Sequence, residues 1–108
     1  MPSPRRLSLD GRAYNIDGRL AEAEAICEAH LRQSGASAQA YYLLGLIRDA
    51  SGDAGAVDYY RKALYLEPDH YESLLHLALW SDKNGQPARA QTFKSRAERV
   101  KIKIVDEA

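Results

Sequence analysis

The side chains best able to do chemistry in this chain are three histidines, one cysteine and scattered carboxylates. His30, His70 and His76 stand at no spacing that would gather them with a nucleophile or with metal ligands. The sequence contains no glycine-rich phosphate loop and no Ser–His–Asp order. Its single cysteine, Cys27, allows neither an internal disulfide nor a cysteine-rich metal centre. We expect surface or packing histidines, a buried structural thiol, and no catalytic residue, metal site or cofactor in these residues.

The composition is that of a globular chain without a dominant charge. Its 108 residues include 15 Lys plus Arg and 15 Asp plus Glu, and 45% of them are hydrophobic. This length predicts one domain over residues 1–108. The charge balance argues against nucleic acid as a partner, and no apolar run approaches the ~20 residues of a membrane span. Residues 1–6 lack the apolar stretch of a signal peptide, so we expect a cytoplasmic protein.

A repeated spacing of glycines shows how the chain is organised. Gly18, Gly52 and Gly85 are separated by 34 and 33 residues, and each precedes an alanine by four or five residues. A fixed period in the low thirties is typical of stacked helical hairpins. Such an array favours a docking surface over a catalyst.

The middle segment carries the clearest helical pattern. Tyr41, Leu44 and Gly45 share one face of a helix that Ser51-Gly52 ends, and Pro68 ends the next helix. The tail from Lys101 to Val105 could fray, extend the last helix or pair as a strand. The predicted helices span residues 5–16, 20–33, 38–50, 55–66, 71–83 and 87–103.

These segments resemble the tetratricopeptide repeat, a helical hairpin of about 34 residues. The match is carried in the middle segment by Tyr41, Leu44, Gly45, Ala56, Tyr60, Ala63 and Pro68. The third segment matches from Tyr71 through Ala97, and the first matches least well, with Asp10 in place of a leucine. The resemblance implies an all-α fold of three hairpins stacked as a short right-handed superhelix, with repeats at about residues 4–37, 38–70 and 71–104.

In this family the first helices of the repeats line a concave groove that holds an extended or helical partner. Asp49 and Asp82 occupy equivalent places on the first helices of successive repeats. There they are suited to interact with polar groups of a partner. Carried over residue by residue, the resemblance implies a groove lined by Arg5, Ser8, Arg12, Asn15, Gln39, Tyr42, Leu46, Asp49, Glu72, Leu75, Leu79 and Asp82.

A second resemblance concerns the surrounding protein. The runs at residues 41–47, 60–70 and 74–78 are similar to the repeat region that follows the catalytic part of some bacterial chemotaxis-type (CheR-type) protein methyltransferases. Those enzymes methylate glutamates of chemoreceptors with S-adenosylmethionine. The resemblance implies a carboxy-terminal regulatory module whose partner is a protein or peptide: a chemoreceptor, a signalling protein or the parent's own catalytic domain.

Two other functions remain open from the residues. One is a stand-alone adaptor for secretion, pilus or envelope assembly, and the other is a homodimer held by the last helix. That helix is expected to expose some of Trp80, Phe93, Val100 and Ile104 at the end of the array. It is also basic, which indicates either a solvated outer face or an acidic partner or neighbouring domain; its basic residues are Arg89, Lys94, Arg96, Arg99, Lys101 and Lys103.

Overall fold

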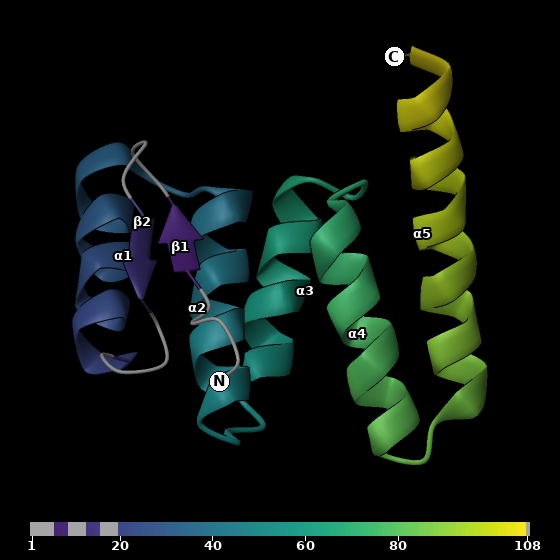
Figure 1. Ribbon diagram of the computed structural model, residues 1–108, viewed down its shortest axis with the longest axis horizontal. Helices are drawn as coiled ribbons and strands as arrows, with labels where there is room; N and C mark the ends of the chain where they lie inside the picture. Colours follow the sequence, from purple (N-terminus) through teal and green to yellow (C-terminus); the bar gives the residue numbers. More distant parts are fainter. Residues whose placement is uncertain (1–5, 9–12, 16–19, 108) are drawn as a thin grey trace.

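The computed structural model describes residues 6–8, 13–15 and 20–107, and its main feature is a row of five helices (Figure 1). Successive helices run in opposite directions through short turns, and α1 and α5 lie at the two ends of the row. Along the described residues, no helix combines the length and apolar character needed to cross a lipid bilayer. The helices are α1 (Leu20–Ser34), α2 (Ala38–Ala50), α3 (Ala56–Leu66), α4 (Tyr71–Lys83) and α5 (Pro87–Glu107).

The helix predicted at residues 5–16 is wrong. Strand β1 (Arg6–Ser8) pairs with β2 (Ala13–Asn15) in antiparallel register, with Leu7 opposite Tyr14. Between the strands the sequence reads Asp10-Gly11, a dipeptide that strongly favours a hairpin turn, and a glycine inside a helix costs about 1 kcal/mol relative to alanine. Apart from these two short strands the described residues form helices, as expected, but the first predicted hairpin lacks its first helix; the stacking as a right-handed superhelix stays a prediction.

Two turns end α2 and α4 with the same hydrogen bonds. Gly52 and Gly85 have φ angles of 76° and 68°, a left-handed conformation that glycine adopts without strain. After α2, the N–H of Gly52 donates to the carbonyl of Asp49 and that of Asp53 donates to the carbonyl of Arg48. After α4, the N–H groups of Gly85 and the next residue donate to carbonyls at the equivalent places. These are Schellman motifs, and they explain why the turn glycines recur at a fixed period.

Side chains cap the starts of α2 and α4, the two helices that Gly52 and Gly85 end. The Ser37 hydroxyl accepts a hydrogen bond from the Ala40 N–H at 3.2 Å at the start of α2. At the start of α4, the ring Nδ1 of His70 accepts from the Ser73 N–H at 3.4 Å. Both bonds satisfy N–H groups that have no partner inside the helix, so they fix where each helix starts.

A close helix contact joins α2 to α3. A Cβ atom added to Gly45 would lie 2.5 Å from the ring of Tyr60, whose side chain is fully buried. No side chain larger than hydrogen fits at Gly45 unless the ring moves. Helices α2 and α3 therefore nearly touch at Gly45.

Three adjoining groups of buried side chains connect the helices from α1 to α5. The first lies between α1 and α2 and includes Cys27 and Leu44, the second surrounds Tyr60, and the third joins Leu74 of α4 to Val100 of α5. Half-buried side chains, Tyr42 among them, pack against two of these groups at once. The core is therefore a chain of contacts between neighbouring helices, as in a repeat array.

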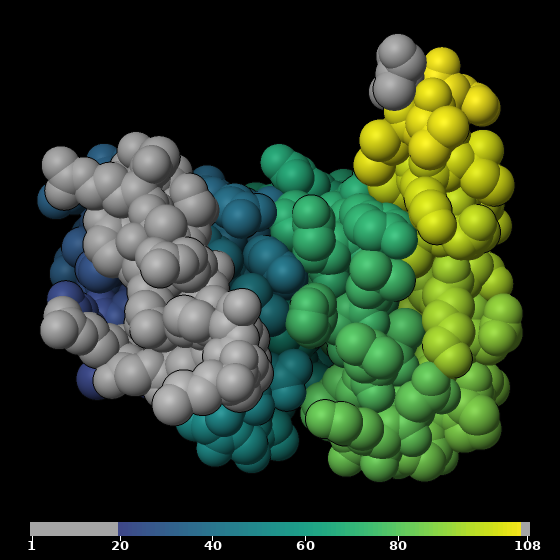
Figure 2. All heavy atoms as spheres, viewed as in Figure 1, coloured from purple at the N-terminus to yellow at the C-terminus, as the bar shows by residue number. Residues whose placement is uncertain are grey.

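The last helix runs further than predicted, through residues 101–107 to Glu107. Val100 is buried, contrary to the expectation that it could be exposed, because it packs with Leu74 and Ala97. The exposed apolar side chains of this helix lie beyond that contact, at Ile102, Ile104 and Val105. In Figure 2 this end of α5, drawn in yellow, stands clear of the other helices.

We expect Gly45→Ala to lower the free energy of unfolding by about 1–3 kcal/mol, because the new methyl group overlaps the buried Tyr60 ring. Gly55→Ala is the matched control, since Gly55 has φ −60° and its nearest neighbour is an exposed aspartate. The control should be as stable as the parent or slightly more stable. Urea unfolding of both variants measures the difference, and equal stability for Gly45→Ala and the parent would contradict this packing.

The thiol of Cys27 provides a test of the α1–α2 contact. Burial, with the charges of Glu24 and Glu28, raises the pKa of Cys27 from 9.0 to about 11. Because the folded state holds this proton more tightly, Cys27 contributes stability below pH 9 that is lost as the pH rises towards 11. Unfolding free energy should therefore fall more steeply over this pH range in the parent than in Cys27→Ala. Parallel curves would show that the thiol is not buried.

Candidate functional site

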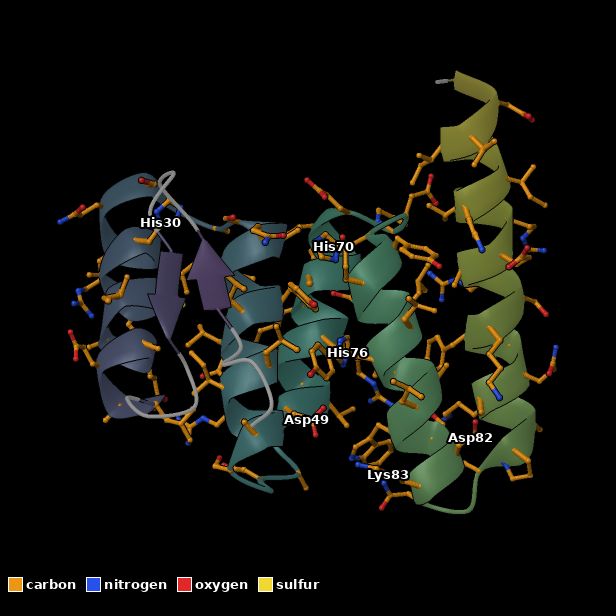
Figure 3. The ribbon with its side chains drawn as sticks, viewed as in Figure 1. His30, Asp49, His70, His76, Asp82 and Lys83 are labelled. Atoms are coloured by element: carbon orange, nitrogen blue, oxygen red, sulfur yellow. The ribbon has the colours of Figure 1, made fainter. Side chains whose placement is uncertain are left out.

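Some of the side chains predicted to line a groove lie near one another where α2 faces α4. Gln39 lies at one end, where its Oε1 is 3.3 Å from Nε2 of His70. Tyr42 lies in the middle, with ring centroids 5.2 Å from His70 and 5.7 Å from His76. Asp49 lies at the other end, with Oδ2 4.0 Å from Nδ1 of His76 (Figure 3). We call this strip the α2–α4 surface, made of Gln39, Tyr42, Asp49, His70, Glu72, His76, Leu79, Trp80, Asp82 and Lys83.

One part of the α2–α4 surface is a hollow of about 400 Å³. Its apolar part comes from Leu79, which is 56% exposed, and from the half-buried Trp80. Its polar part comes from Asp49, Asp82 and Lys83, together with the ring of His76. An exposed leucine beside carboxylates suits an apolar side chain that carries a positive charge nearby.

Several predicted lining residues lie elsewhere or carry other contacts. Leu46 packs against the α1–α2 core and Leu75 against the α4–α5 core, so both are half-buried. Arg12 lies outside the described residues, and Asn15 lies in β2, where it is opposite Arg6. The first repeat therefore supplies no described helix to the surface.

Tyr42 is a packing residue as well as a surface residue. Its ring is tilted against Tyr60 at 6.2 Å, and it contacts the core groups on both sides of α3. Burial, and next the negative charge of Glu72, raises the pKa of its hydroxyl above 10.0. Tyr42 therefore stays neutral at physiological pH, and its replacement would disturb folding together with any binding.

Asp49 and Asp82 stand at equivalent places in the sequence but have different surroundings. The Asp49 carboxylate accepts a hydrogen bond from the hydroxyl of the buried Tyr60 at 3.0 Å. Asp82 instead pairs with Lys94 of α5 at 2.7 Å, and both of those side chains are nearly half exposed. One carboxylate is thus tied to the core and the other to an exposed ion pair.

His70, His76 and Trp80 were not assigned to the groove from the sequence. His70 is buried and caps α4, and its Nδ1 lies 2.9 Å from the Ser73 hydroxyl. The ring of His76 stacks on Tyr60 with centroids 5.4 Å apart. Both are packing histidines, as expected. The signal that could have placed His76 is its spacing of four residues after Glu72 and three before Leu79, both assigned to the groove.

The described residues do not gather the groups that metal chemistry needs. Across residues 6–8, 13–15 and 20–107, no cluster of three or more His, Cys, Asp or Glu side chains could hold a metal ion. The described part of the chain is a set of packed helices with a strip of polar and aromatic side chains between α2 and α4.

Comparison with known proteins gives this helical chain a context. It is 47% identical over 84 residues to "Probable biofilm formation methyltransferase WspC" of Pseudomonas putida, a match that covers 77% of this chain and 20% of that protein. It is 47% identical over 83 residues to the protein of the same name from Pseudomonas aeruginosa, covering 76% of this chain and 20% of that protein. The chain thus spans about a fifth of the length of these relatives. No family model and no solved structure matches it.

Replacing the two equivalent aspartates separately tests this geometry. Asp49→Ala should lower the free energy of unfolding by about 1–3 kcal/mol, because the buried Tyr60 hydroxyl loses an acceptor. Asp82→Ala should cost less than about 1 kcal/mol, because exposed ion pairs contribute little. Urea unfolding at neutral pH compares the two, and equal costs would contradict the different roles of these carboxylates.

Proposed function

We propose that this chain is the regulatory, protein-binding part of a chemotaxis-type protein methyltransferase that acts in bacterial signalling. The observation that carries the proposal is the 47% identity, over most of this chain, to a fifth of two methyltransferases. In this proposal the helices form a tetratricopeptide-type array, and S-adenosylmethionine-dependent transfer to glutamate is done by a separate catalytic domain. The module itself is cytoplasmic and transfers no methyl group.

The α2–α4 surface is the proposed binding site for the partner. Leu79 and Trp80 offer apolar area inside a hollow, and Asp49, Asp82 and Lys83 offer charges at its edge. Such a combination of a concave apolar floor and a charged rim is typical of peptide recognition by helical surfaces. The proposed partner is a chemoreceptor, a signalling protein or the catalytic domain of the same methyltransferase.

The methyltransferase relatives favour this function over a stand-alone adaptor for secretion, pilus or envelope assembly. The proposal therefore expects the native reading frame to encode an S-adenosylmethionine-binding domain before residue 1. Sequencing the gene upstream of this segment tests it. A reading frame that begins at Met1 would leave the adaptor as the better proposal.

A binding measurement tests the surface itself. We expect Leu79→Ala to weaken binding to the partner by about 1–3 kcal/mol, since exposed apolar anchors in a hollow carry much of the binding energy. Ile102→Ala is the matched control, because Ile102 on α5 is 54% exposed, close to the 56% of Leu79. Calorimetric titration with a receptor cytoplasmic domain, and separately with the catalytic domain, measures both variants.

The control should bind as the parent does, and circular dichroism should show that both variants are folded. Unchanged affinity for Leu79→Ala would contradict a partner site on the α2–α4 surface. A loss confined to Ile102→Ala would instead support contact through the last helix, including the homodimer.

A further inference from the structure

A second hollow, of about 150 Å³, lies where the α3–α4 turn meets α5. Its floor is apolar, formed by the buried side chains of Leu74 and Val100. Pro68 and Asp69 of the turn form one side. This hollow shares no lining residue with the α2–α4 surface.

The other side of the hollow is a set of three cations on α5. Arg96, Arg99 and Lys103 are spaced three and four residues apart, which places them on one side of the helix. All three line the hollow; Arg96 is half-buried, whereas Arg99 and Lys103 are exposed. The basic composition of the last helix is thus concentrated at a specific place.

Two of these cations are held by the turn. Nη2 of Arg96 donates to the carbonyl of Pro68 at 3.4 Å, and its guanidinium carbon lies 5.9 Å from the centre of the Phe93 ring. Nζ of Lys103 lies 3.7 Å from Oδ2 of Asp69. These contacts bring both cations to the hollow, although the Lys103–Asp69 pair, with side chains 63% and 67% exposed, adds little stability of its own.

The charges in the hollow do not cancel. Three cations face one carboxylate, that of Asp69. Within the described residues, Arg99 has no carboxylate within ion-pair distance. An anion that enters the hollow would therefore supply the charge that the protein itself leaves unmatched.

We propose that this hollow binds a carboxylate, supplied by an Asp or Glu side chain in an acidic segment of a protein partner. A guanidinium presents paired N–H donors that match the two oxygens of a carboxylate. The methylene groups that carry such a carboxylate, which inorganic phosphate lacks, can contact the exposed edge of Val100 and the alkyl stems of the cations. The site goes beyond the proposed function, because it uses another face of the array and does not require a methyltransferase.

Titration of the 108-residue chain with defined probes tests the proposal. The probes are a blocked peptide containing two glutamates, the same peptide with glutamines, and inorganic phosphate. We expect the glutamate peptide to cause saturable NMR shifts centred on the side chain of Arg99 and the backbone of the α3–α4 turn. The glutamine peptide should cause none.

Charge variants distinguish a built site from diffuse attraction. Arg99→Gln should weaken binding of the glutamate peptide by about fivefold or more, as loss of a charge-assisted hydrogen bond does. The matched control is Lys101→Gln, which removes the same charge two residues away on the other side of α5 and should change affinity less than about twofold. Asp69→Asn should strengthen binding, because it removes the carboxylate that competes for Lys103.

Three outcomes would overturn the proposal. Equal losses in Arg99→Gln and Lys101→Gln would show only a diffuse field around α5. Tighter binding of phosphate than of the glutamate peptide at these residues would make this a phosphate site instead. Absence of saturable shifts with the glutamate peptide at low salt would leave no carboxylate site, and unchanged backbone spectra of the variants exclude misfolding as the cause.

Discussion

The arrangement of the helices depends on the contact between Gly45 and Tyr60. The glycine lets α2 approach α3 until the tyrosine ring fills the space that a side chain would otherwise occupy. The same tyrosine reaches out of the core, since its hydroxyl donates to Asp49 and its ring stacks on His76. One residue therefore sets the distance between two helices and also orients two side chains of the α2–α4 surface. Packing and recognition are coupled through it.

The positions of α1 to α4 could be predicted from the sequence because local signals agree there with the long-range pattern. Turn glycines, Pro68 and the spacing of apolar residues all give the same boundaries, to within a residue or so. The segment at residues 5–16 failed because Gly11 satisfied two patterns. As a small residue it matched the repeat, and as part of Asp10-Gly11 it favoured a hairpin between strands. The conformation of residues 101–105 could not be assigned, because their alternating charged and β-branched residues resemble a strand. A helix that already exists can nevertheless extend through them, since each added residue gains one hydrogen bond.

The candidate surface was predictable at the level of helix faces but not of individual partners. Spacing grouped Gln39, Tyr42, Asp49 and Leu79 as lining residues, and in the structure all four belong to the α2–α4 surface. It could not show that Asp49 is bonded to a buried tyrosine while Asp82 pairs across to α5, because those partners come from other helices. The hollow beside Arg99 could not be predicted from the sequence either, because it forms only where the α3–α4 turn lies against the last helix.

The two Schellman turns, at Gly52 and Gly85, close successive helices with the same set of hydrogen bonds. Because the same turn recurs, the segment between its two copies is a structural repeat unit, and each turn is a joint between units. Duplication or loss of a whole unit would leave every remaining joint intact, whereas insertion of a few residues would break one. The length of such an array can therefore change by whole units during evolution, and its binding preferences can change separately, through side chains on the exposed faces.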